Sequence, residues 1–102
     1  MKPIRQGDVL LLPVTKLPKG AVDRNLQQPV VLKIGEAVGH AHQFLDHTKV
    51  RMWDAGAERF IQVIEQADLI HDEHTTIQVP PGLYKLPDQV EYTPGELRKV
   101  SD

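Results

Sequence analysis

Short apolar stretches, separated by proline, glycine and polar residues, run the length of this chain and predict β-strands. Val30, Leu32 and Ile34 fall on one face at period two, as in a strand with one buried side. Residues 8–14 place apolar side chains on both parities, so we expect this strand to be covered on both faces. Further strands are predicted at 40–46, 49–54, 59–65, 67–72, 75–79, 83–86 and 89–93.

A helix competes with strands over residues 59–72, because Phe60, Ile61 and Ile64 also fit helical spacing. The β-branched residues of this segment favour the strands. We expect a loop at 17–28 and a bend or bulge at 35–39. The polar tail at 96–102 is expected to form an edge strand or a helical turn. About eight short strands with turns about every 8–12 residues predict an all-β fold, a small barrel or sandwich that forms a single domain over residues 1–102.

Composition narrows the classes of partner and chemistry. Hydrophobic residues make up 40% of the chain and charged residues 25%, which is typical of a globular domain. The net charge of −2 gives no general attraction to nucleic acid or to a membrane surface. Cysteine is absent, which excludes disulfides, thiolate nucleophiles and zinc–sulfur sites. No apolar window approaches the roughly 20 residues of a membrane helix or resembles a signal peptide, so we expect a complete cytoplasmic protein.

Four of the five histidines form two close pairs, His40 with His42 and His71 with His74. Residues i and i+2 of a strand point to the same side, so the first pair is expected to present two imidazoles on one face. The second pair flanks an acidic dipeptide at the end of a predicted strand. If the two segments are neighbours in the fold, up to four imidazoles and a carboxylate converge there.

Such a cluster has two chemical interpretations. Imidazole nitrogen suits divalent zinc, iron, nickel or copper, and a carboxylate completes the common mixed sites. A free imidazole pair could instead act as acid and base on a phosphodiester, with Lys85 or Arg51 holding the phosphate. Two plainer alternatives stay open, in which the first pair faces solvent and residues 71–74 form a solvated loop.

Gly35, the His40-Ala41-His42 triplet and Asp46 resemble the first metal-binding motif of the cupins, which are double-stranded β-helix proteins. The resemblance implies that His40, His42 and Asp46 are metal ligands, with Asp46 in place of the usual glutamate. The second cupin motif supplies its last histidine from a Pro-x-Gly-x-x-His segment. This chain has Pro-Pro-Gly-Leu-Tyr-Lys at 80–85, so Lys85 occupies that position and His71 or His74 would have to substitute.

A second resemblance covers nearly the whole chain. Five segments of the chain resemble a group of small uncharacterised proteins from bacteria and phages. They are Gln-Gly-Asp-Val-Leu at 6–10, Gly-His-Ala-His at 39–42, His-Asp-Glu-His at 71–74, Pro-Pro-Gly-Leu-Tyr at 80–84 and Glu-Tyr-Thr-Pro at 91–94. This resemblance implies one intact domain and a bacterial or phage setting, and it implies no activity.

Two functions follow from these observations. The first is a small cytosolic β-barrel protein whose histidine cluster (His40, His42, His71, His74, with Asp46) binds a divalent transition metal. The second is a non-enzymatic accessory or assembly module that binds a protein partner, or a second copy of itself, through edge strands. Glycine-rich phosphate loops, dinucleotide fingerprints and arginine-rich or aromatic nucleic-acid motifs are absent from the sequence, which makes nucleic acid an unlikely partner. The sequence leaves open whether the protein is an enzyme.

Overall fold

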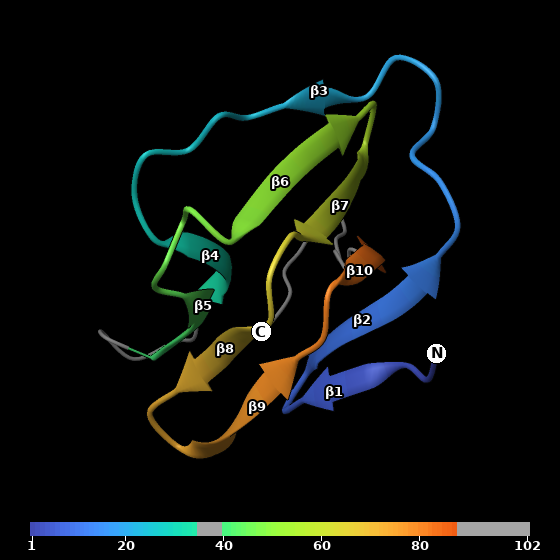
Figure 1. Ribbon diagram of the computed structural model, residues 1–102. Helices are drawn as coiled ribbons and strands as arrows, with labels where there is room; N and C mark the ends of the chain where they lie inside the picture. The colour runs from blue at the N-terminus through green and yellow to red at the C-terminus, as the bar shows by residue number, and fades with distance from the viewer. Residues whose placement is uncertain (35–39, 88–102) are drawn as a thin grey trace, which may run out of the picture.

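The computed structural model describes residues 1–34 and 40–87, and within these ranges the chain forms ten β-strands and no helix (Figure 1). The prediction of an all-β fold is confirmed. The strands are β1 (Ile4–Gln6), β2 (Val9–Val14), β3 (Val22–Asp23), β4 (Val30–Ile34), β5 (Ala41–Phe44), β6 (Val50–Ala55), β7 (Glu58–Val63), β8 (Ala67–His71), β9 (His74–Val79) and β10 (Gly82–Leu86).

The strands form two antiparallel sheets. The six-stranded sheet has the order β1-β2-β10-β7-β6-β3, and the four-stranded sheet has the order β4-β5-β8-β9. Strand β1 also lies beside β9, so these edge strands of the two sheets meet at one side of the molecule (Figure 1). Pairing of a partner with one of the edge strands stays a prediction.

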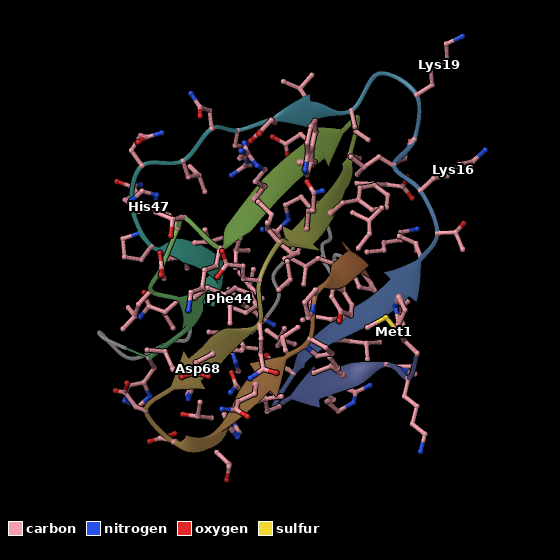
Figure 2. The ribbon with its side chains drawn as sticks, viewed as in Figure 1. Met1, Lys16, Lys19, Phe44, His47 and Asp68 are labelled. Atoms are coloured by element: carbon pink, nitrogen blue, oxygen red, sulfur yellow. The ribbon has the colours of Figure 1, made fainter. Side chains whose placement is uncertain are left out.

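The two sheets share one apolar core. Leu11, Ile61 and Tyr84 of the larger sheet and Phe44 and Leu69 of the smaller sheet are fully buried. Figure 2 shows Phe44 in the interior of the molecule. The Tyr84 hydroxyl donates a hydrogen bond to the carbonyl of Pro80 at 2.8 Å, so its polar atom is paired although the ring is buried. The fold is therefore a two-sheet arrangement around a common core, as the alternating apolar positions predict.

The competition between helix and strands over residues 59–72 is resolved as the strands β7 and β8. Sequence analysis missed β1 and β3, which contain three and two residues and carry no readable alternation. The predicted loop at 17–28 therefore contains a short strand. The expected bend at 35–39, strand at 89–93 and tail at 96–102 lie outside the described residues.

Two features bear on the wider predictions. The described part of the chain has no helix long and apolar enough to cross a membrane. A cupin-like identity and a cytoplasmic location stay predictions.

Candidate metal centre

Three histidines lie side by side across the four-stranded sheet, one on each of β5, β8 and β9. Phe44 of β5 is paired with Leu69 of β8, and continuing this register by two residues places His42 opposite His71. On the next strand His71 is directly paired with His74. The ring centroids of His42 and His71 are 4.3 Å apart, and those of His71 and His74 are 4.7 Å apart. We call His42, His71 and His74 the histidine row.

A β-bulge in β9 places His74 in this row. Leu69 pairs with Ile77, but two residues further along β8 His71 pairs with His74, three residues back along β9. Strand β9 therefore carries one extra residue in this stretch. Because directly opposite residues of an antiparallel pair share a face, a regular register would have put Thr75 opposite His71. The bulge instead turns an imidazole toward the other two, which is how bulges re-aim side chains near functional sites.

The three imidazoles are close enough to share one metal ion. His42, His71 and His74 each offer one nitrogen, and these nitrogens lie within 4.8 Å of one another. A tetrahedral zinc ion with bonds of about 2.0–2.1 Å holds its ligand nitrogens about 3.4 Å apart, so zinc binding would draw these nitrogens closer together. His42 is buried, His71 is half-buried and His74 is exposed, which leaves the group open to solvent on one side.

His42 is the anchored member of the row. The residue is only 3% exposed, and its Nδ1 lies 2.9 Å from Oε1 of Gln6, which is equally buried. The Gln6 amide nitrogen donates to the carbonyls of Leu69 and Thr75, at 2.9 Å and 3.0 Å. Since carbonyl oxygens accept hydrogen bonds and never donate them, the Gln6 amide must direct its nitrogen at these two carbonyls and its oxygen at His42. His42 therefore donates from Nδ1–H and keeps Nε2 as the free nitrogen.

A carboxylate lies beside that free nitrogen. Oδ1 of Asp8 is 3.3 Å from Nε2 of His42, and Oδ2 of the same residue accepts a hydrogen bond from Lys33 Nζ at 2.6 Å. The hydrogen bond from Lys33 lowers the pKa of Asp8, so this carboxyl is ionised at neutral pH. Burial, together with the neighbouring His71, lowers the pKa of His42, so its imidazole is neutral. The unprotonated nitrogen of His42 and the free oxygen of Asp8 are thus two electron-pair donors that face each other, an arrangement that suits a cation.

His71 is held differently. Its Nδ1 accepts a hydrogen bond from the backbone N–H of Glu73 at 3.0 Å. In a neutral imidazole the accepting nitrogen has no proton, so the proton sits on Nε2. To bind a metal, His71 must either exchange the Glu73 N–H for the ion at Nδ1 or move its proton and release that amide. A metal ion bound at His71 would therefore perturb the β8–β9 turn.

His40 lies at the rim of the centre. Its ring centroid is 5.8 Å from that of His71, and its two nitrogens are each 3.7 Å from a carboxylate oxygen, one on Asp72 and one on Glu73. The structure thus brings His40 near the second histidine pair, but outside the set of three nitrogens that converge. The acidic turn gives this rim a negative charge.

Asp46 lies apart from the histidine row. It lies beyond the C-terminal end of β5, whereas His42 is near the start of that strand. The Asp46 side chain is exposed and accepts hydrogen bonds from the backbone N–H and the hydroxyl of Thr48. These hydrogen bonds lower the pKa of Asp46. It lines a surface hollow with Leu45 and Asp68, among others. His47 is likewise remote; Figure 2 places it at the side of the molecule, by the segment that joins β3 to β4.

Sequence reasoning missed the Gln6-Gly7-Asp8 turn as part of the site. Gln6 and Asp8 contact His42, and Gly7 lies against the ring of His74. A Cβ on Gly7 would be 2.6 Å from Nε2 of His74, and the φ of 59° at Gly7 already favours glycine. The tripeptide was visible as a segment shared with small uncharacterised proteins, but only the fold places it beside the histidines.

One comparison with known proteins gives a match. A family model described as a domain of unknown function (DUF8820) matches residues 5–89. The matched segment contains the Gln6-Gly7-Asp8 turn and all three members of the histidine row. Neither the curated proteins nor the solved structures give a match to this chain.

Proposed function

The chain belongs to the DUF8820 family, a domain of unknown function, and from that premise we propose that it binds one divalent transition metal ion through His42, His71 and His74. The observation that carries this proposal is the convergence of one nitrogen from each of three imidazoles on adjacent strands. Three imidazoles form a donor set that suits zinc, copper, nickel or iron. Three protein ligands leave a coordination position for water or another small molecule.

The alternative of metal-free acid–base chemistry on a phosphodiester has less support. Lys85 pairs with Glu58 at 2.6 Å, and Arg51 pairs with Asp23 at 2.8 Å; both basic residues lie on the six-stranded sheet. Neither therefore serves as a phosphate-binding cation beside the histidines. The acidic turn places Asp72 and Glu73 beside His40 at the rim of the row, and their charge repels an anionic substrate while attracting a cation.

The direct test is metal content and affinity of the protein purified without a histidine tag. We expect one equivalent of zinc to bind after incubation with Zn²⁺, measured by plasma mass spectrometry following removal of free ion. His42→Ala should abolish stoichiometric binding, because it removes the buried ligand. His47→Ala is the matched control and should bind as the wild type does, since His47 lies outside the row.

A second readout reports the mode of binding. Since metal binding at His71 releases or replaces the hydrogen bond from the Glu73 N–H, the Glu73 amide resonance should shift strongly when Zn²⁺ is added. A wild-type protein that stays free of zinc, iron, nickel and copper after incubation with each ion contradicts the proposal. So does binding that persists unchanged in His42→Ala.

A further inference from the structure

We propose that Gln6 is the positioning residue of this metal centre, which fixes the ring of His42 so that Nε2 is its ligating nitrogen. The inference rests on the proposed function and adds a role that no metal ligand performs. One side chain on β1 makes hydrogen bonds to three segments: to His42 on β5, to the Leu69 carbonyl on β8 and to the Thr75 carbonyl on β9.

The position of the two carbonyls connects Gln6 to the other ligands. Leu69 precedes His71 by two residues, and Thr75 directly follows His74. Both carbonyls belong to the stretch where the bulge interrupts the β8–β9 ladder. Gln6 therefore supplies hydrogen bonds to backbone carbonyls where the bulge interrupts the hydrogen bonds between β8 and β9. Through its third hydrogen bond it connects both strands to the ring of His42.

The tautomer of His42 follows from this network. Because the Gln6 amide nitrogen is engaged by two carbonyl acceptors, its oxygen faces Nδ1 and requires a proton there. The unprotonated Nε2 then points toward Oδ1 of Asp8 at 3.3 Å. Two acceptor atoms at this distance repel each other, and a cation bound to Nε2 relieves that repulsion. The network thus directs the lone pair of His42 Nε2 toward the carboxylate of Asp8.

Burial makes the arrangement costly to break and therefore well defined. Gln6 and His42 are the buried polar residues of the described part of the chain, at 3% exposure each. Water does not replace the lost partners readily at such positions, so an alternative tautomer would leave the Gln6 oxygen unpaired. Partners of this kind, which orient a metal-binding histidine, typically change metal affinity by about 10- to 100-fold when they are removed.

Two substitutions separate positioning from simple structural support. Gln6→Leu removes all three hydrogen bonds. Gln6→Glu, when its carboxylate is ionised, keeps an acceptor for the proton on His42 Nδ1 but cannot donate to the Leu69 and Thr75 carbonyls. Gln78→Leu, at an exposed amide on β9, is the matched control. The two readouts are the ¹⁵N shifts of the His42 ring in metal-free protein at neutral pH and the Zn²⁺ affinity of the folded variants, measured by competition with a chelator.

We expect wild-type protein, Gln6→Glu and Gln78→Leu to show the Nδ1–H form of His42, and Gln6→Leu to lose it. Zn²⁺ affinity should fall about 10- to 100-fold in Gln6→Leu and distinctly less in Gln6→Glu. The inference is overturned if metal-free wild type carries its proton on Nε2, or if the two Gln6 variants lose affinity equally. Failure of the proposed function would appear separately, as a wild-type protein with the Nδ1–H form that binds no Zn²⁺.

Discussion

Two neighbouring rows of side chains on the four-stranded sheet differ in chemistry: one is apolar and spans four strands, and the other is the histidine row, which spans three. The apolar row contains Val30, Phe44, Leu69 and Ile77, which are paired in register across all four strands. The histidine row lies two residues further along β5 and β8. The side chains of the apolar row are stabilised by packing alone. The ring nitrogens of the histidine row must each bind a proton, a hydrogen-bond partner or a metal ion. One sheet therefore places core-packing side chains in one row and candidate metal-binding side chains in the next row, two residues away on β5 and β8.

The largest expected effect is in the apolar row. Phe44 is completely buried, so Phe44→Ala should lower the free energy of unfolding by about 3–5 kcal/mol, because it leaves a cavity in the shared core. Chemical denaturation of metal-free protein measures this loss. Leu45→Ala, at the exposed neighbouring position, should change stability by less than about 0.5 kcal/mol. Equal losses in the two variants would contradict the assignment of the core.

A smaller effect is expected where the β1–β2 turn meets the histidine row. Gly7 and Gly56 both adopt positive φ, 59° and 63°, so alanine at either position should cost about 1–2 kcal/mol of stability. Only Gly7 has a close neighbour, the ring of His74, whereas a Cβ on Gly56 meets nothing within 4 Å. Gly7→Ala should therefore also weaken Zn²⁺ binding, and Gly56→Ala should leave it unchanged. Equal Zn²⁺ affinities in both variants would show that His74 does not need the space above Gly7.

The smallest expected effect is a pH dependence confined to the histidine row. The pKa of His42 is lowered in the fold, chiefly by burial and then by His71, so the unfolded chain takes up this proton at higher pH than the folded one. Asp8 opposes the shift, and His74 adds to it. Stability of metal-free protein should therefore decrease as the pH falls below about 6.5, the usual histidine pKa.

His42→Gln removes this titrating group and should flatten that part of the stability profile, measured by denaturation at a series of pH values. Phe44→Ala should lower the whole profile and keep its slope. Asp8, whose pKa is lowered by Lys33, contributes stability that is lost only at more acidic pH, below its usual value of 3.8. An unchanged slope in His42→Gln would contradict the neutral, buried state of His42.

Strand positions were predictable from local patterns, whereas the sequence analysis left the pairing of the two histidine segments as a condition. The alternation of Val30 with Leu32 and the β-branched stretch around Ile61 identify strands correctly. The spacing of His40 and His42 draws attention to the right segment, although His42 alone joins the converging set. Short strands such as β3 have too few residues for a period to appear.

The rest of the site depends on register, which local patterns do not contain. A bulge that exchanges Thr75 for His74 leaves no mark on the alternation of β9, where most positions are exposed. Gln6 is a polar residue in a three-residue strand, and its role arises because β1 lies beside β9. Asp46 matched a motif by spacing, yet the strand direction carries it away from the histidine row.

The network around Gln6 also has a consequence for the order of events in folding. Its hydrogen bonds join positions separated by 36, 63 and 69 residues along the chain, so the centre forms only after long-range loops have closed. Contacts this distant in sequence form slowly, because the entropy of loop closure is lost before they are made. A bound ion would then act mainly on the native side of the barrier, slowing the escape from the folded state while leaving the rate of its formation nearly unchanged.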